Sequence, residues 1–500
     1  MPPTFSLSCP PFGPLRRRRL LAAFAAGLAA GAAQALTLAP CSLPGVEHPA
    51  QCGTLQRPLD PVASPGRRFD LHVAVLPALA RHKHADPVVF LAGGPGQSAI
   101  ELAGHAQRLL ARLGQRRDLL LVDLRGTGRS APLRCDDPDD AGRPLADTLD
   151  GDAMLDRLRR CRAALQALPH GDLRFYTTTL AMQDLEAVRQ ALRVPRLNLV
   201  GLSYGTRAAL EYLRLYPDRV RRVVLDGVAP ADMALPLSSA LDARTSFDAL
   251  MAWCTGDAAC ARRHPALETR WRQMLSTLPR AVVLVHPLTG RDERLMLDAD
   301  GAESLLRGAL YTPVLASALP EAMEQAIEGR WQALAGLAAA LGGAGRRGTV
   351  AQGLHFSVVC AEDAPRLDGA PAPPSVGPGA SLTRLYRQVC ADWPRGTVPA
   401  GYGVIGPAPV PVLLLSGGLD PVTPPRHAAR AAQALGTRAR HLVVPNAGHG
   451  VAALPCLRDQ LFRFVDAELE DQALAVDDGC ARELPRPRAF VPPIAPERGR

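Results

Sequence analysis

Three residues that together can activate a hydroxyl nucleophile occur in this chain in the order serine, aspartate, histidine. Ser203 lies in GLSYG, residues 201–205, where flanking glycines suit a sharp strand-to-helix turn. Asp420 follows the apolar run VPVLLLSGG, and His449 follows RHLVVPNAG. A serine hydroxyl becomes a good nucleophile when a neutral imidazole takes its proton. We therefore predict Ser203 as the nucleophile, His449 as its general base and Asp420 as the acid that orients the imidazole.

A tetrahedral intermediate at Ser203 would carry a negatively charged oxygen, which needs preorganised hydrogen-bond donors. The sequence GGPG, residues 93–96, follows an apolar run and can aim a backbone N–H at that oxygen. Pro95 has no N–H and can only shape this loop. We predict that the oxyanion hole consists of the N–H groups of Gly94 and Tyr204.

Other polar residues near strand ends are alternatives. Asp226 follows the apolar residues VVL and is a second candidate for the acid. His427 and His441 lie off the terminal turn and are interpreted as surface or packing residues. The segment DLRGTGRS, residues 123–130, has the glycine content of a phosphate-binding loop but lacks the required Gly-Lys-Ser/Thr. Arg125 is therefore expected to form a structural ion pair beneath the site.

These residues need a scaffold that ends several strands at one edge. Continuous apolar runs that end in glycine-rich turns suit parallel strands covered on both faces. Such runs occur in residues 87–96, 118–128, 197–205, 222–230, 410–420 and 440–450. Helical patterns such as 178–194 and 206–217 separate them, which predicts a doubly wound, mostly parallel α/β sheet. The alternating stretch 69–78 is expected to add antiparallel strands at the edge, and ligands are expected at the carboxyl ends of the parallel strands.

The strand and helix alternation stops near Pro230 and resumes near Pro409. The intervening sequence has mainly helical periodicity, with one hairpin-like stretch that turns at Thr289 and Gly290. We interpret this region as a mainly helical cap inserted into the core. The predicted organisation is a signal peptide (1–35), a first core part (36–230), a cap (231–405), a second core part (406–482) and an extended tail (483–500).

Residues 1–35 have the pattern of a secretory signal peptide. Four arginines at 16–19 precede an apolar run of 14 residues, and Ala33-Gln34-Ala35 provides a small-x-small cleavage site. That run is shorter than the roughly 20 residues that span a bilayer. We expect cleavage after Ala35, no stable membrane anchor afterwards, and a secreted or periplasmic protein. Both Sec and twin-arginine export stay open.

Composition argues against a nucleic-acid partner. The formal net charge is +9, the four leader arginines contribute four of these charges, and Lys83 is the only lysine. The high content of arginine, alanine, glycine and proline resembles a genome composition bias. No basic stripe interleaved with aromatic residues is present in the sequence, so nucleic-acid binding is not expected.

Ten of the eleven cysteines follow the leader, and they fall into sequence-local pairs. The candidate disulfides are Cys41 with Cys52, Cys135 with Cys161, Cys254 with Cys260, Cys360 with Cys390, and Cys456 with Cys480. Disulfides are the expected state in an oxidising compartment, although other connectivities are open. A zinc site is disfavoured because the chain contains no Cys-x-x-Cys. No metal and no cofactor is predicted.

Five motifs together resemble those of the prolyl aminopeptidase-like serine peptidases, and within them the secreted bacterial tripeptidyl-aminopeptidase group. They are GLSYG, GGPG, DLRGTG, GLDPVTPP at 418–425 and NAGHG at 446–450. The segments 201–230 and CAEDAP at 360–365 are also similar to that group. The resemblance implies an α/β-hydrolase fold and removal of residues from free peptide N-termini.

The same resemblance implies that an acidic residue in or near the cap binds the α-ammonium group of the substrate. Glu362 or Asp363, beside Cys360, is the matching candidate, since a cation in a partly dry pocket requires a counter-charge. A solvated loop or a helix-capping role is the alternative. Ala92 stands where prolyl aminopeptidases often carry histidine, which weakens the expectation of a strict proline preference.

The leading hypothesis is an exported serine aminopeptidase of prolyl or tripeptidyl type. It would cleave peptides with a free N-terminus through an acyl-enzyme on Ser203. The alternative is an esterase or another small-molecule acyl hydrolase on the same scaffold, because a fold does not fix the substrate. A catalytically inactive binding protein is disfavoured because all three catalytic positions are filled.

Overall fold

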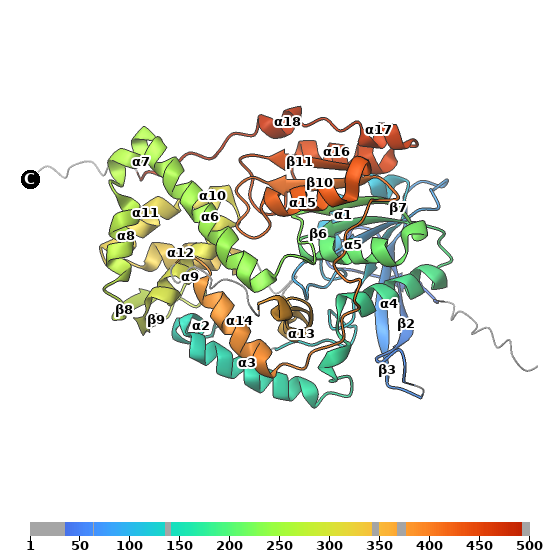
Figure 1. Cartoon of the computed structure of the whole chain (residues 1–500), viewed down its shortest axis with the longest axis horizontal. Helices are drawn as coiled ribbons and strands as arrows, with labels where there is room; N and C mark the ends of the chain where they lie inside the picture. The colour runs from blue at the N-terminus through green and yellow to red at the C-terminus, as the bar shows by residue number, and fades with distance from the viewer. Residues whose placement is uncertain (1–35, 64, 136–141, 343–349, 368–376, 493–500) are drawn as a thin grey trace, which may run out of the picture. The chain divides into compact units, whose positions relative to one another are not determined.

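The computed structural model describes residues 36–63, 65–135, 142–342, 350–367 and 377–492 (Figure 1). The predicted signal peptide, residues 1–35, lies outside the described residues, and so does the end of the predicted tail. Within the described residues, no helix has the length and apolar character required to cross a bilayer.

A nine-stranded sheet organises the core, in the order β1-β2-β3-β5-β4-β6-β7-β10-β11. Its strands are β1 (Ala39–Cys41), β2 (Ala50–Pro58), β3 (Arg68–Leu76), β4 (Val88–Leu91), β5 (Leu119–Val122), β6 (Leu197–Leu202), β7 (Val220–Asp226), β10 (Val412–Gly417) and β11 (Ala439–Val444). All pairs from β5 to β11 are parallel, as the apolar runs predicted. The strands β3, β2 and β1 extend the sheet beyond β5 as antiparallel strands at its edge, as expected.

Helices cover both faces of this sheet, which explains why its strands are apolar throughout. In β4, Val88 and Phe90 belong to the apolar cluster that includes α1 and α16. Val89 and Leu91, which point to the opposite face, belong to the cluster that includes α4, α5 and α15. The predicted doubly wound α/β-hydrolase fold is therefore confirmed.

The helices fall into those of the sheet core and those of the predicted cap. The α-helices outside residues 231–405 are α1 (Ala103–Leu109), α2 (Leu145–Leu149), α3 (Gly151–Gln166), α4 (Thr178–Ala191), α5 (Tyr204–Leu215), α15 (Pro425–Leu435), α16 (Pro455–Asp466), α17 (Glu470–Leu474) and α18 (Gly479–Arg482). Those inside are α6 (Leu235–Gly256), α7 (Ala258–Arg263), α8 (Leu267–Leu275), α9 (Ala299–Leu310), α10 (Pro313–Ala316), α11 (Leu319–Ile327), α12 (Gln332–Gly342), α13 (Gln352–Glu362) and α14 (Ala380–Asp392). Short 3-10 helices are η1 (Leu113–Gln115), η3 (Leu173–Phe175), η4 (Pro217–Arg219), η5 (Ala364–Arg366) and η6 (Gly436–Arg438).

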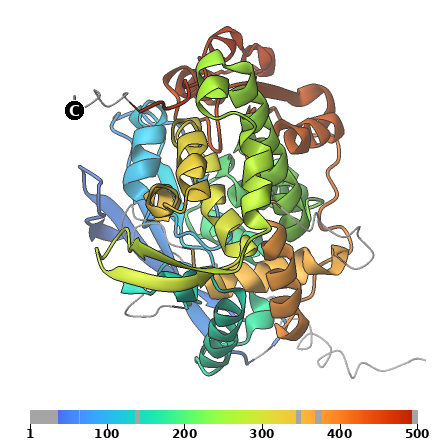
Figure 2. The same cartoon turned by 90° about the vertical axis from the view of Figure 1, so that its left-hand side faces the viewer.

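The region from α6 to α12 has an apolar core of its own, which includes Trp271 and Trp331. It also contains the predicted hairpin, formed by β8 (Arg280–Val285) and β9 (Asp292–Leu297) as a separate two-stranded sheet (Figure 2). Gly290, with a φ of +70°, lies in the connecting turn.

Two parts of the chain pack differently from the sequence interpretation. Helices α13 and α14, placed in the predicted cap, contribute to the same apolar cluster as one face of the sheet. Helix α3, placed in the predicted core, packs against α14, and α2 packs against β9 (Figure 1). The boundaries at 230 and 405 therefore mark where the alternation of strand and helix patterns stops and resumes. That they are also the limits of a cap domain stays a prediction.

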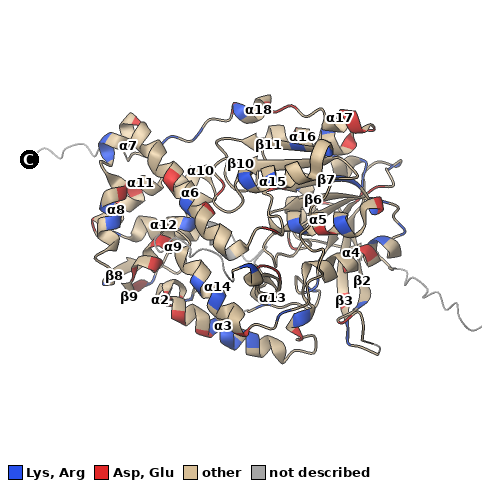
Figure 3. Ribbon diagram, in the orientation of Figure 1, with Lys and Arg blue, Asp and Glu red and all other residues tan. Residues whose placement is uncertain are grey.

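The ten cysteines form five disulfides in the sequence-local pairs, 41–52, 135–161, 254–260, 360–390 and 456–480. The pair Cys360–Cys390 joins α13 to α14. Along α3 the acidic residues lie in the first half and are followed by the arginines (Figure 3).

Candidate active site

Ser203 lies on the turn between β6 and α5, in a backbone conformation that non-glycine residues rarely adopt. Its φ is +55° and its ψ is −121°, and its N–H donates to the carbonyl of Asp226 at 2.8 Å. A Cβ on Gly201 would lie 2.4 Å from the Gly205 carbonyl oxygen, and one on Gly205 would lie 2.1 Å from that of Leu91. Both glycines of GLSYG are therefore required because the turn packs closely on itself and on β4.

Asp420 follows β10 and is hydrogen-bonded to the histidine that follows β11. Its Oδ2 lies 2.8 Å from His449 Nδ1. Asp420 Oδ1 accepts the N–H groups of Val422 and Thr423 at 2.8 and 2.9 Å, and the Thr423 hydroxyl donates to Oδ2 at 2.7 Å. The carboxylate is thus fixed by its own turn, and the bond at Nδ1 leaves Nε2 of His449 as the nitrogen available to a nucleophile.

The aspartate and histidine shift each other's pKa in opposite directions. Burial alone lowers the pKa of His449, but the charge and hydrogen bond of Asp420 outweigh it and raise the net pKa above its ordinary value. Burial alone raises the pKa of Asp420, but His449 and the hydrogen bonds from Thr423 hold the net pKa below its ordinary value. An ionised Asp420 therefore favours the imidazolium that forms when His449 accepts a proton.

Asp226, the alternative acid, has a different set of partners. Its Oδ1 and Oδ2 accept the backbone N–H groups of Val451 and Ala452, each at 2.9 Å. These bonds hold the loop that follows His449 against the end of β7. The geometry therefore gives Asp226 a structural position and gives Asp420 the contact with the imidazole.

The residues predicted for the oxyanion hole lie close to the serine. Tyr204 is the first residue of α5, where the backbone N–H has no acceptor within the helix. Gly94 lines the same cavity as Ser203 and His449. The loop approaches the serine closely, since a Cβ on Gly93 would lie 3.2 Å from the Ser203 Cβ.

The start of α13 holds this loop in place. The N–H of Ala351 donates to the Gly96 carbonyl at 2.9 Å, and His355 Nδ1 lies 3.3 Å from the Pro95 carbonyl oxygen. Burial lowers the pKa of His355 to about 4, so this imidazole is neutral at neutral pH. Its Nδ1–H can then donate to Pro95 while its Nε2 accepts from the hydroxyl of Tyr386 at 2.6 Å.

Two cavities meet at the serine and histidine. The larger, about 490 Å³, is lined by Ser203 and His449 together with side chains from α3, α6, α9, α13 and α14. The smaller, about 240 Å³, is also lined by both residues and by Asp226 and His105. A substrate bound at Ser203 therefore has space for groups on either side of the bond to be cleaved.

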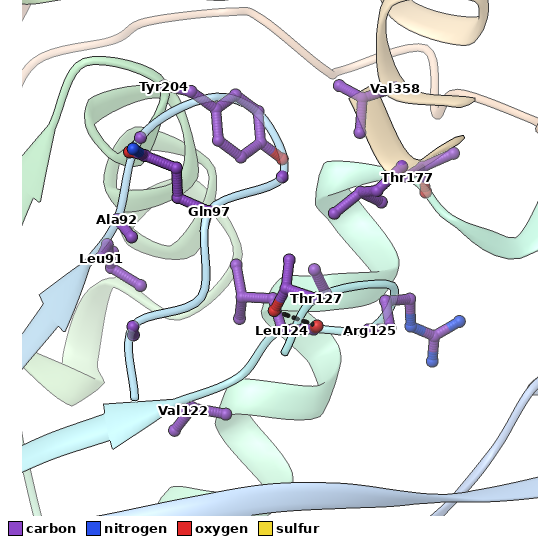
Figure 4. A pocket seen from close by; sticks show the side chains of 15 residues that line it. Leu91, Ala92, Gln97, Val122, Leu124, Arg125, Thr127, Thr177, Tyr204 and Val358 are labelled. Atoms are coloured by element: carbon purple, nitrogen blue, oxygen red, sulfur yellow. Dashed lines mark hydrogen bonds between the residues drawn. The ribbon is translucent and has the colours of Figure 1, made fainter. Parts of the chain in front are cut away.

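Arg125 lies beneath the site, as expected. Its guanidinium pairs with Asp184 at 2.7 Å and donates to the carbonyls of Leu59 and Phe175. Figure 4 shows its side chain directed away from a cavity of about 10 Å³ that Tyr204, Gln97 and Thr127 help to line. That space suffices for about one water molecule.

Glu362 and Asp363, proposed from the resemblance as ligands for an α-ammonium group, are buried and paired. Asp363 Oδ2 accepts from Arg207 Nη1 at 2.9 Å. Glu362 accepts from the N–H and hydroxyl of Thr178, at 2.7 and 2.9 Å, and from the hydroxyl of Tyr402. Their side chains are at most 1% exposed, and neither lines the two cavities at Ser203. This geometry favours the helix-capping alternative, because Glu362 accepts the N–H of Thr178 at the start of α4 and Asp363 Oδ1 accepts that of Leu235 at the start of α6.

Several residues at the site carried no signal in the sequence. Tyr311 follows α9, its carbonyl accepts the N–H of His449 at 2.9 Å, and its ring lies edge-on to the imidazole at 5.5 Å. Arg307, one turn earlier on α9, lines the larger cavity. Functional residues were predicted from their position after parallel strands. This criterion identifies Ser203, Asp420 and His449, but it cannot identify a residue on a helix of the predicted cap. His427, interpreted as a surface or packing residue, is buried and bonded to Asp242 of α6 at 2.8 Å, which agrees with the packing role.

The fold and site define a class of protein. The pattern of the alpha/beta hydrolase fold family matches residues 86–452, and the chain belongs to this family. With a serine on the strained turn and the bonded aspartate and histidine, the protein is a serine hydrolase. Within the described residues, no group of three or more His, Cys, Asp or Glu side chains is placed to hold a metal ion.

Relatives place the chain near known peptidases. It is 31% identical to a tripeptidyl aminopeptidase of Streptomyces lividans over 216 residues, which cover 40% of this chain and only 39% of that relative. It is 27% identical to the serine protease Hip1 of Mycobacterium tuberculosis, over 77% of this chain and 80% of the relative. Among solved structures, the proline iminopeptidase of Mycobacterium smegmatis is 16% identical with a TM-score of 0.36, over 84% of this chain and 98% of that one. The predicted resemblance to prolyl aminopeptidase-like peptidases is confirmed.

Proposed function

We propose that the protein is an exported serine aminopeptidase, of prolyl or tripeptidyl type, that acts through an acyl-enzyme on Ser203. The observation that carries the proposal is the contact of 2.8 Å between Asp420 Oδ2 and His449 Nδ1, on a histidine that shares its cavities with Ser203. The relative named as a tripeptidyl aminopeptidase supports the aminopeptidase class.

In this proposal the hydroxyl of Ser203 attacks the scissile carbonyl carbon while His449 Nε2 takes its proton. The N–H groups of Gly94 and Tyr204 bind the oxygen that becomes negatively charged. His449 then donates the proton to the leaving amine, so that the C–N bond breaks and an ester to Ser203 remains. Water, activated by the same histidine, hydrolyses this ester and regenerates the serine.

Export is supported by the five disulfides, which are the expected state of cysteines in an oxidising compartment. The leader that would direct it lies outside the described residues. N-terminal sequencing of the protein recovered from the culture medium or periplasm tests this part. A mature chain beginning at Leu36 is expected, whereas retention of residues 1–35 in a cytoplasmic protein contradicts it.

Cleavage of a mixed peptide pool, followed by mass spectrometry, tests the activity. The wild type should release short fragments from free N-termini but not from acetylated copies of the same peptides. Ser203→Ala should release none and should not be labelled by a fluorophosphonate. Equal turnover of free and acetylated peptides contradicts the aminopeptidase assignment but leaves the serine hydrolase intact.

One observation favours the second candidate, an esterase or other acyl hydrolase. Among the described residues that line the two cavities, Asp226 is the only Asp or Glu, and both its oxygens already accept backbone N–H groups. A peptide α-ammonium group therefore has no readily available counter-charge there. Turnover of short acyl esters without any release from peptides would select this candidate.

A further inference from the structure

The larger cavity at Ser203 has an unusual charge for a site expected to receive an ammonium group. Its described lining includes Arg157 and Arg307 but no Asp or Glu. The two arginines come from different elements, α3 and α9, which the fold brings to one space. The positive charge of Arg307 in this cavity attracts an anionic group and repels a cationic one.

Among the described residues, no carboxylate pairs with Arg307. Its guanidinium lies over the Tyr311 ring at 5.9 Å from the ring centre, and its Nη2 is 3.5 Å from the Tyr311 hydroxyl. Its Nε is buried and has no hydrogen-bond partner in the described part of the chain. The other buried arginines near the site differ, since Arg125 pairs with Asp184 and Arg207 with Asp363.

The charge of Arg307 also affects the pKa of His449, the proposed base. The positive charge of Arg307 acts to lower the pKa of His449, against the larger effect of Asp420 that raises it. An unneutralised guanidinium thus opposes the imidazolium that must form during acyl transfer. A bound anion would supply the missing partner of Arg307 and would remove this opposition.

We propose that Arg307 binds a carboxylate of the substrate in the cavity that contains Ser203. The inference rests on the proposed acyl transfer at Ser203 and adds a substrate class to it, namely short peptides or esters that carry a carboxylate near the reacting carbonyl. In a peptide, this carboxylate is either the free C-terminus or an acidic side chain. The recognition is the same in both cases, because guanidinium pairs with carboxylate through two parallel N–H donors.

Paired substrates distinguish the two sources. One pair is an alanine pentapeptide with a free C-terminal carboxylate and the same peptide with a C-terminal amide. The other pair is the amidated peptide with a single glutamate in place of an alanine, and its glutamine counterpart. The wild type should cleave the acid of at least one pair with a kcat/KM about tenfold to a hundredfold higher than its neutral partner, the range expected for a charged hydrogen-bonded pair.

Variants assign this preference to Arg307. Arg307→Gln should abolish the acid-to-neutral ratio of kcat/KM, and Arg307→Lys should retain part of this ratio. Arg330→Gln is the matched control, because it also removes one positive charge. Arg330 is exposed, pairs with Glu328 and lines neither cavity. A variant that loses activity equally on acid and neutral peptides would indicate a structural role and overturn the proposal.

Binding without turnover keeps this test separate from the proposed function. Calorimetry with Ser203→Ala should detect tighter binding of the acid peptide than of its amide, and the double variant Ser203→Ala with Arg307→Gln should lose this difference. Equal affinity of Ser203→Ala for all four peptides contradicts the carboxylate site. If fluorophosphonate labelling and all turnover fail in the wild type while the acid peptide still binds better, the proposed function fails and the carboxylate site stands.

Discussion

The backbone N–H of His449 donates to the backbone carbonyl of Tyr311 at 2.9 Å, so the loop that carries the base is bonded directly to the chain between α9 and α10. The contact is close enough to exclude side-chain atoms. A Cβ on Gly448 would lie only 2.1 Å from the Tyr311 carbonyl oxygen. The position of His449, the proposed general base, therefore depends on a segment from the predicted cap, although His449 and its partner Asp420 both follow strands of the sheet.

Gly448→Ala should separate these two segments and displace His449. We expect kcat to fall by about a hundredfold, since a displacement near 1 Å at a reacting group has an effect of that size. The thermal transition should move little. Gly336→Ala in α12 is the control, because nothing lies within 4 Å of the added Cβ, and it should leave kcat unchanged. An unchanged kcat in Gly448→Ala would show that the base does not need this contact.

The two aspartates near the base should respond differently to amidation. Asp420→Asn should lower kcat by up to about ten thousand-fold, because the imidazole loses its orienting acid. Asp226→Asn should mainly destabilise the fold, by about 1–3 kcal/mol, because a buried acceptor of two N–H groups is altered. Steady-state kinetics on an ester and denaturant unfolding measure the two effects. A larger loss of kcat in Asp226→Asn than in Asp420→Asn would identify Asp226 as the acid that orients His449.

The pH dependence of kcat/KM should report the ionisation of His449. His449 must be neutral to accept a proton, so activity should fall as the pH drops through its pKa. Burial lowers this pKa, but the larger effect of Asp420 raises it above the ordinary value of 6.5. We expect an acid limb with a midpoint above 6.5. In Asp420→Asn the residual activity should show this midpoint at a lower pH. A limb that does not move between the two proteins would mean that another group titrates.

The carboxylates beside Arg207 give a test of the role expected from the resemblance. Glu362→Gln keeps an oxygen that can accept from Thr178 or Tyr402 and should change stability by only about 1–2 kcal/mol. Asp363→Asn leaves the charge of Arg207 without its 2.9 Å partner and should cost about 3–5 kcal/mol. Unfolding curves measure both values. A large rise in KM for free N-termini, with stability unchanged, would restore Glu362 as a substrate ligand.

The sequence by itself determined that the core is a mostly parallel sheet and that Ser203, Asp420 and His449 each follow one of its strands. Long Val/Leu runs between helical patterns have few ways to be buried, and GLSYG, GLDPVTPP and NAGHG each follow such a run. The local cysteine pairs could be predicted as well, because the partners are at most 30 residues apart.

Only the tertiary structure decided what surrounds those residues. Arg307, Tyr311 and His355 lie on or beside helices whose periodicity shows burial but not which neighbour each side chain meets. The pairing of Glu362 and Asp363 with Arg207, about 155 residues earlier in the chain, likewise depends on long-range packing. Local patterns fix which residues are buried on a strand or helix, whereas the charge and shape of a cavity arise where distant segments meet.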